Sequence, residues 1–148
     1  MEFRKADMKD IDHLSQIRKK QLIDEGQDPD IDIDEKLKSF FERQMKEEKM
    51  VEWVAIEDEK IVGTAAIMFL DFPPSFSNQI GIRGYITNMY TDPSYRRKGI
   101  ALTLLNQLIE EAKQRNITHI FLSASEYGKP VYEKCGFRVK DSWMEYEG

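Results

Sequence analysis

A basic turn between residues 96 and 101 has the residue types that bind an anion. It reads Arg-Arg-Lys-Gly-Ile-Ala and joins an apolar strand to an amphipathic helix. The first N–H groups of a helix lack internal partners and lie at the positive end of its dipole, so they can bind a phosphate. Gly99 and Ala101 leave the approach open and Lys98 adds charge. About four or five charge-assisted hydrogen bonds of this kind would hold a pyrophosphate. The alternative is a solvated helix start with ordinary basic residues.

The turn lacks the features of two common nucleotide-binding motifs. No Gly-Lys-Ser/Thr closes it, as a Walker loop requires, and it has only one of the glycines of a GxGxxG loop. It resembles instead the Arg/Gln-x-x-Gly-x-Gly/Ala signature of the GNAT N-acetyltransferase superfamily, whose loop binds the pyrophosphate of acetyl-coenzyme A (acetyl-CoA). Arg96, Gly99 and Ala101 match the three fixed positions. The resemblance implies that acetyl-CoA is a cosubstrate bound at the start of the helix, by Arg96, Arg97, Lys98, Gly99, Ile100, Ala101 and Leu102.

A second motif lies further along the chain. The run from Tyr132 to Phe137 resembles the Tyr-Glu-x-x-Gly-Phe motif of the same family, and the two motifs have the expected order and separation. Val131 and Cys135 are four residues apart and share a helix face, so Tyr132, turned by about 100°, can direct its hydroxyl elsewhere. The alternative is a core tyrosine bonded to backbone. The resemblance favours a catalytic Tyr132 that gives a proton to the departing thiolate.

The strand before the turn supplies further expected contacts. By the same resemblance, backbone N–H groups at about Met89 and Tyr90 would polarise the thioester carbonyl, and the backbone of Thr91 would meet the pantetheine arm. Ser125 stands where the family often has an Asn that holds this arm. Its hydroxyl can make one such hydrogen bond.

The general base is not resolved by the residues. A primary amine has a pKa of about 10 and must lose a proton before it attacks. Asn88 lies near the place where some family members have an acidic base, but an amide cannot accept that proton. We take Glu126 as the candidate catalytic base, acting through water.

Length and composition are those of one soluble domain, which we expect to span residues 1–148. The net charge of −5 argues against nucleic acid as a partner. No apolar run approaches the ~20 residues that span a bilayer, and no signal peptide is evident, so we expect a cytoplasmic protein without membrane contacts. We expect no metal: Asp28, Asp30 and Asp32 resemble a calcium loop, but Ile33 and Ser39 replace its glycine and glutamate.

Periodicity predicts an alternation of strands and helices. The expected strands are Phe3–Ala6, Val51–Glu57, Ile61–Leu70, Gly84–Thr91 and Ile117–Ala124, with a last hairpin of Phe137–Lys140 and Ser142–Tyr146. The expected helices are Met8–Asp24, Asp34–Glu48, one that begins at the basic turn, and Lys129–Cys135. Gly63 inside a strand indicates a bulge or a close backbone approach. The fold class is α/β (α+β): by resemblance, a GNAT-like mixed, mostly antiparallel sheet of about seven strands with about four helices.

Two segments could contact an acceptor. Residues 24–35 contain seven acids and no base, and form either a solvated loop or an electrostatic lure for a cationic acceptor. Residues 71–83 form a long connection that either reaches toward an acceptor or is a surface excursion.

The resemblance implies direct transfer of an acetyl group from acetyl-CoA to a primary amine of a small molecule or peptide. One alternative is a non-catalytic acyl-CoA sensor that regulates a partner; another is an interaction protein that uses the acidic segment. Edge strands make a homodimer possible.

Overall fold

The computed structural model describes residues 1–140 and 142–148. One sheet has the strand order β1-β2-β3-β4-β5. The strands are β1 (Glu2–Lys5), β2 (Met50–Glu57), β3 (Lys60–Asp71), β4 (Ile82–Thr91) and β5 (Ile120–Leu122). The helices are α1 (Ile11–Asp24), α2 (Asp34–Lys46), α3 (Ile100–Gln114) and α4 (Lys129–Lys134), with 3-10 turns η1 (Met8–Asp10) and η2 (Pro93–Tyr95).

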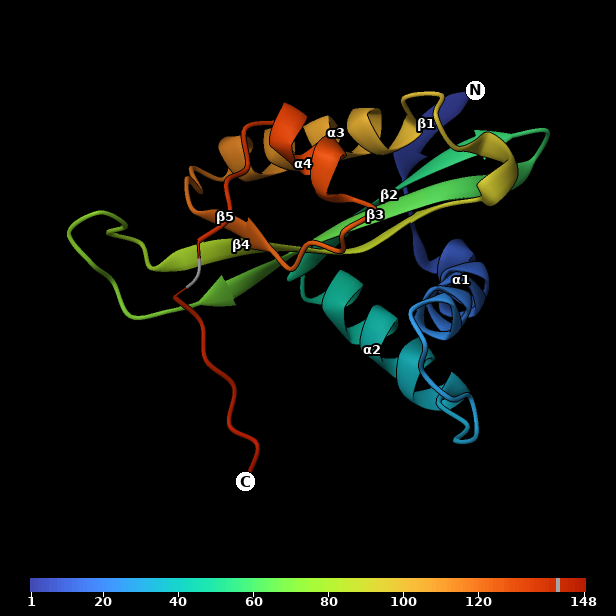
Figure 1. The fold of residues 1–148 in the computed structure, drawn as a ribbon, viewed down its shortest axis with the longest axis horizontal. Coiled ribbons are helices and arrows are strands. Elements are labelled where there is room, and N and C mark those ends of the chain that lie inside the picture. Colours follow the sequence, from blue (N-terminus) through green and yellow to red (C-terminus); the bar gives the residue numbers. More distant parts are fainter. Residues whose placement is uncertain (141) are drawn as a thin grey trace.

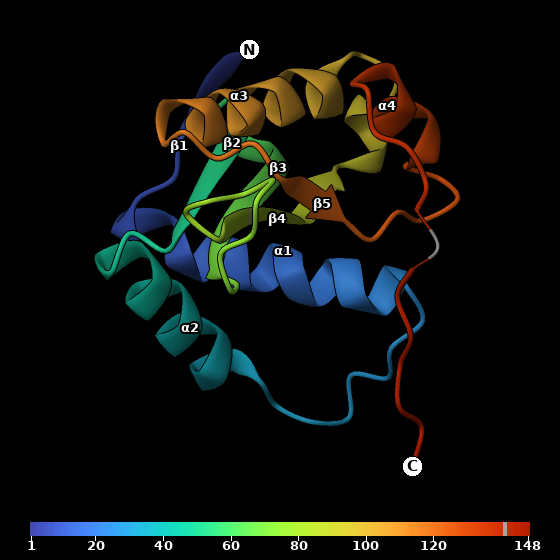
Figure 2. The ribbon, with the colours of Figure 1, turned by 90° about the vertical axis from the view of Figure 1, so that its left-hand side faces the viewer.

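The sheet lies between two layers of helices. Helices α3 and α4 cover one face, and α1 and α2 cover the other (Figures 1 and 2). Strands β1 to β4 pair antiparallel, whereas β5 runs parallel to β4 after the crossover through α3. The prediction of a mixed α/β fold with four helices and a mostly antiparallel sheet is confirmed.

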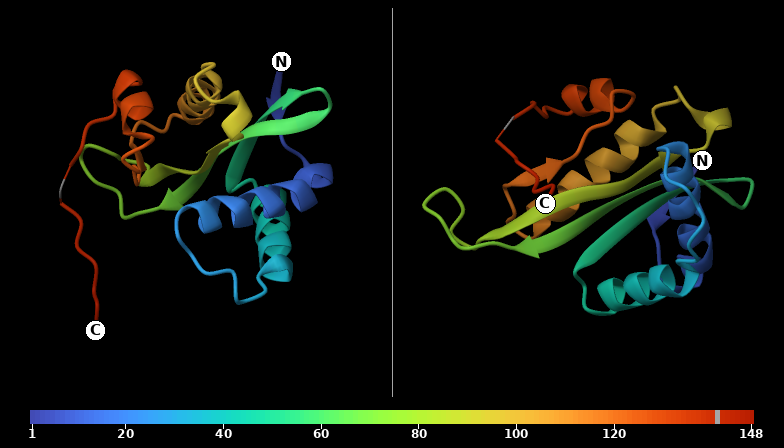
Figure 3. Two further views of the ribbon diagram at one scale, coloured as in Figure 1. Left: turned by 45° about the vertical axis from the view of Figure 1, so that its right-hand side comes forward. Right: turned by 60° about the horizontal axis from the view of Figure 1, so that its bottom comes forward.

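The strand count differs from the prediction of about seven. Among residues 1–140 and 142–148 the sheet has five strands, and the segments 137–140 and 142–148 form none. The alternation of apolar and polar residues suggested a hairpin, but its apolar side chains are not buried: Val139 and Trp143 are 62% and 68% exposed. The terminal segment extends away from the sheet (Figure 3), although the Trp143 ring stacks on Phe121 of β5 with centroids 6.0 Å apart.

Both sheet faces have an apolar core. On the α3 side the fully buried side chains include Val62, Ile67, Leu104, Leu105 and Leu108. On the other side, Leu14 of α1 and Phe41 of α2 pack against Val54 and Ala66. Burial of apolar area is the main stabilising term here, at roughly 25 cal/mol per Å².

Gly63 lets α3 lie close to β3. A Cβ atom at this position would be 2.8 Å from Ile100 Cγ2, closer than carbon atoms approach without something moving. The prediction of a close backbone approach at Gly63 is therefore confirmed, and its partner is the first residue of α3.

The long connection between β3 and β4 lies at the opposite end of the sheet from the basic turn. It precedes β4, whereas the turn comes after β4, and Figure 1 shows it beyond the far end of the strands. Of the two interpretations of this segment, the surface excursion fits the structure.

Candidate active site

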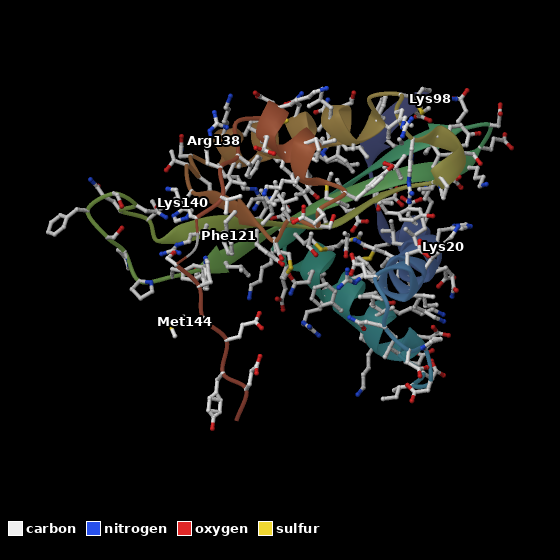
Figure 4. The ribbon with its side chains drawn as sticks, viewed as in Figure 1. Lys20, Lys98, Phe121, Arg138, Lys140 and Met144 are labelled. Atoms are coloured by element: carbon white, nitrogen blue, oxygen red, sulfur yellow. The ribbon has the colours of Figure 1, made fainter. Side chains whose placement is uncertain are left out.

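The basic turn ends in an open helix N-terminus. Gly99 is the N-cap of α3 with φ 79°, a left-handed conformation that suits glycine, and no side chain caps the helix. Arg97 also has a positive φ, 65°. Arg97, Lys98 and Gly99 are all exposed, and Figure 4 shows Lys98 at the start of α3. A Cβ added at Gly99 would meet no atom within 4 Å, so an anion can approach the first N–H groups.

Next to this turn, β4 parts from β5. The two strands pair only at Gly84–Ile86 with Ile120–Leu122, so β4 continues beyond the pairing up to Thr91. The Met89 carbonyl accepts a hydrogen bond from Gln21 Nε2 (3.0 Å), and the Thr91 carbonyl accepts one from Arg96 Nε (3.1 Å). Both carbonyl groups therefore face away from β3. Tyr90 lies opposite Thr64 of β3, and strand alternation turns its backbone toward that neighbour.

Tyr132 lies on α4 and is 9% exposed. Its ring packs edge-on against Phe137, with centroids 6.2 Å apart. Burial, and secondarily the negative charge of Glu25 at the end of α1, raise the pKa of the Tyr132 phenol above its ordinary value of 10.0. The hydroxyl therefore keeps its proton at neutral pH and can act as a proton donor.

Arg96 brings the basic turn next to the segment between β5 and α4. Its guanidinium carbon lies 5.2 Å from the centroid of the Tyr127 ring, which places the basic turn beside the segment between β5 and α4. That exposed segment carries Ser125 and Glu126. The Ser125 hydroxyl oxygen accepts a hydrogen bond from the Gly128 N–H (3.1 Å), so this side chain also shapes the entry to α4.

A β-bulge lies within the parted section of β4. The Cα partners step from Ala66–Thr87 to Thr64–Tyr90, which leaves one extra residue on β4. Asn88 is in this extra stretch with φ 54°.

Two residues near the bulge were not predicted as site residues from the sequence. Gln21 contacts Met89, and the buried Glu52 accepts a hydrogen bond from Asn88 Nδ2 (3.3 Å). A signal for Glu52 was present, since it alternates with Met50 and Val54 on the buried side of β2. No comparable signal marks Gln21.

Comparison with known proteins establishes the family. Residues 11–137 match the model of the acetyltransferase (GNAT) family. The chain belongs to the GNAT family. The resemblance drawn from the two motifs is thus confirmed.

Solved GNAT structures share the whole fold. A crystal structure of a predicted acetyltransferase with acetyl-CoA from Clostridium acetobutylicum is 53% identical, with a TM-score of 0.94, and the match covers 99% of this chain and 95% of that one. A GCN5-related N-acetyltransferase from Ralstonia eutropha JMP134 is 25% identical, with a TM-score of 0.88, over 98% and 97% of the two chains.

A relative with a stated substrate matches over a shorter span. The glucosamine 6-phosphate N-acetyltransferase of Trypanosoma brucei brucei is 33% identical over 88 residues. The match covers 60% of this chain and 58% of that protein's length.

Metal clusters and membrane-spanning helices are both absent from the described residues. Outside residue 141, the structure has no cluster of three or more His, Cys, Asp or Glu side chains arranged to hold a metal ion. Over the same residues, every helix is too short or too polar to cross a bilayer.

Proposed function

We propose that this GNAT domain transfers an acetyl group from acetyl-CoA to a primary amine of a small molecule or peptide, by direct transfer. The observation that supports this best is that Tyr132, which keeps its proton, shares a buried cluster with Ile100 at the open start of α3, while β4, the strand before this turn, parts from β5. The neighbouring structure with acetyl-CoA, at 53% identity, adds support.

The basic turn and the first turn of α3 would hold the diphosphate of acetyl-CoA. Backbone N–H groups from Arg97 to Leu102 donate to the phosphate oxygens, and Arg96 and Lys98 add positive charge. When bound, the cosubstrate supplies a thioester, whose acetyl group is activated for transfer.

The parted section of β4 would orient the thioester. The Met89 carbonyl faces away from β3, and in a strand the N–H of a residue points to the same side as its carbonyl. The Met89 N–H can therefore donate to the thioester carbonyl oxygen and stabilise the negative charge that develops there. Thr91, whose carbonyl faces the same side, and Ser125 would bind the pantetheine arm. Tyr90 contributes less through its backbone, because that backbone is turned toward β3.

Proton transfers complete the proposed reaction. The ammonium of the acceptor loses a proton through water to Glu126, and its nitrogen then bonds to the carbonyl carbon as the C–S bond breaks. Tyr132 gives its proton to the departing sulfur, and the second proton that the amine nitrogen loses on becoming an amide passes through water to restore the phenol. Cys135 is a poor acyl carrier, because burial raises its thiol pKa, and this favours direct transfer.

The charge near Tyr132 favours a cationic acceptor. Glu25 is near enough to raise the Tyr132 pKa, and it belongs to the acidic segment between α1 and α2. Polyamines, aminoglycosides and lysine peptides therefore suit this side of the site better than a phosphorylated amino sugar, the substrate class of the trypanosome relative.

Thiol release from acetyl-CoA, measured with a panel of these amines and glucosamine 6-phosphate, tests the proposal. We expect turnover with at least one amine and a fall in kcat of about 10²-fold in Tyr132→Phe, at constant KM for acetyl-CoA. Tyr146→Phe is the matched control, since Tyr146 is 90% exposed in the terminal segment.

Other outcomes would favour the alternatives. Tight binding of acetyl-CoA without turnover, unaffected by Tyr132→Phe, would indicate a sensor. No thermal stabilisation by coenzyme A would indicate an interaction protein without this cofactor.

A further inference from the structure

Glu52 of β2 has a carboxyl group that is buried between the sheet and the layer of helices α1 and α2. It is 3% exposed and lies on the face of β2 that also carries Val54, toward α1 and α2. A buried carboxyl is costly unless it is hydrogen-bonded or neutral. A leucine or methionine would pack here at less cost, so the presence of a carboxyl calls for a role.

The hydrogen bond of Glu52 crosses an entire strand. Glu52 Oε1 accepts from Nδ2 of Asn88 on β4, so the contact passes over β3. Ala66 of β3 lies opposite Glu52 on one side and Thr87 on the other. Its methyl side chain leaves room above β3 for the two longer side chains to meet.

Asn88 is held at both its side chain and its main chain. Its carbonyl accepts a hydrogen bond from Thr64 Oγ1 (2.8 Å), while its side chain donates to Glu52. A left-handed conformation is unfavourable for residues other than glycine, although least so for Asn, and it persists where the surroundings enforce it. The two contacts enforce it here, at the β4 bulge.

The bulge controls the direction of the next peptide. Met89 comes directly after Asn88, and its carbonyl is fixed by Gln21 Nε2 on α1. The Met89 N–H is the group that the proposed function directs at the thioester. A change in the Asn88 backbone would rotate it.

We propose that Glu52 is a positioning residue for acetyl transfer: its hydrogen bond with Asn88 fixes the β4 bulge and thereby the direction of the Met89 N–H. This inference rests on the proposed function. Glu52 acts through Asn88 because its own carboxyl, beneath α1, is closed to a bound acceptor.

The charged groups around Glu52 are consistent with a carboxyl that stays neutral. Arg18 of α1 and Asp10 of η1 act on it in opposite directions, and Asp10 is bonded to both terminal nitrogens of Arg4 on β1. From α2 the buried Phe41 faces this core. Burial raises the pKa of Glu52 to about 8, so the group is mostly protonated at neutral pH.

Two substitutions separate positioning from proton transfer. Glu52→Leu removes the acceptor of the Asn88 bond, and we expect kcat to fall about ten-fold or more with KM for acetyl-CoA within about two-fold. Glu52→Gln keeps a carbonyl oxygen for Asn88, and we expect it to recover at least about half of kcat and to keep the pH profile of kcat/KM.

Glu111→Leu is the matched control. Glu111 is also a buried glutamate, but it lies on α3, where it accepts from Trp53 Nε1 (3.3 Å) and pairs with Lys5 (2.9 Å). Its loss should lower Tm and leave kcat unchanged.

Amide spectra of the full chain provide a readout that does not need turnover. Glu52→Leu should shift the Asn88 and Met89 amide resonances, whereas Glu52→Gln and Glu111→Leu should leave them near their wild-type positions. This result would support the inference even if no amine is acetylated, an outcome that would overturn only the proposed function.

Three results would overturn the inference. They are a Glu52→Leu variant with wild-type kcat, unmoved Met89 and Asn88 resonances in that variant, and a Glu52→Gln variant that loses activity together with the rising limb of its pH profile. The last result would make Glu52 a proton acceptor. If Glu52→Leu does not fold, Glu52→Gln and Asn88→Gly, which keeps the left-handed backbone but lacks the amide, test the same point.

Discussion

The protonation of Tyr132 leads to a prediction about alkaline pH. Burial and the charge of Glu25 raise its pKa above 10.0, so the phenol keeps its proton over the whole range in which the acceptor amine becomes neutral. We therefore expect kcat to rise with pH and to show no falling limb below about pH 10. Stopped-time thiol assays from about pH 6 to about pH 10 measure this. A decline centred near pH 8 that persists in Glu52→Gln, where the Glu52 titration is removed, would contradict the role of Tyr132 as donor.

Glu52 makes stability depend on pH in the opposite sense from most carboxylates. Its pKa is about 8 in the folded chain against an ordinary value of 4.5, so its contribution is complete below pH 4.5 and is lost as pH rises to 8. The slope is about 1.4 kcal/mol per pH unit in that window. Glu52→Gln should therefore match the wild type at pH 4.5 and be more stable at pH 8. Urea titrations at both values measure the difference.

Equal stability of the two proteins at pH 8 would mean that the folded-state pKa of Glu52 is not raised. Asp10 provides a reference in the same experiment. Its hydrogen bond with Arg4 lowers its pKa, so its contribution to the free energy of unfolding is present at neutral pH and is lost as the pH falls below its ordinary pKa.

At single residues, sequence predicted best where a motif carried the information. The spacing of family signatures singled out Tyr132, Gly99 and Arg96, whose roles in the site stay predictions. Glu52 was missed because its partner, Asn88, is 36 positions away and two strands across. Such a pair depends on strand register, which no local pattern encodes.

The N-terminus of α3 leads to a prediction for cosubstrate binding. Gly99→Val places a β-branched side chain at φ 79° and in front of the first N–H groups, so we expect the Kd for coenzyme A to rise about ten-fold or more. Isothermal titration calorimetry measures it. Gly26→Val is the control: Gly26 also has a positive φ (97°) with open space around it, but it lies after α1, so its loss should cost stability alone. Equal effects of the two substitutions on Kd would contradict the proposed site.

Helices and strands could be predicted from periodicity, but the paired length of the last strand could not. The expected α1, α2, β2, β3 and β4 agree with the structure to within a few residues. The apolar run Ile117–Ala124 yields only three paired residues, and its pairing with β4 ends at Ile86–Leu122, just before the β4 bulge. The local sequence of a strand predicts that it is extended, but the number of residues that pair depends on the partner strand.

The charge distribution of the whole molecule leads to a prediction for the acceptor. With a net charge of −5 and an acidic segment near Tyr132, a polycationic amine should be attracted over a distance. Asp28→Asn with Asp30→Asn should raise the KM of such an amine several-fold and weaken the salt dependence of kcat/KM. Asp32 is left intact because its carboxylate accepts a hydrogen bond from the N–H of Asp34, the first residue of α2 (2.9 Å). An unchanged KM at low salt would identify these acids as solvated loop residues.

The molecule as a whole differed most from expectation at its C-terminus. The alternation of residues suggested a closing hairpin, yet residues 137–140 and 142–148 add no strand to the sheet, and the outer edge of β5 has no strand from them beside it. The Tyr-Glu-x-x-Gly-Phe motif predicts α4 and its end at Gly136, but it carries no information about the conformation of the chain after Phe137.

The contact between Gly63 and Ile100 links a strand interior to the helix that carries the anion site. In evolutionary terms, a larger residue at position 63 would push the start of α3 outward unless position 100 lost bulk at the same time. We therefore expect the two positions to change together across descendants of this chain, so that ligand affinity constrains a site that never touches the ligand.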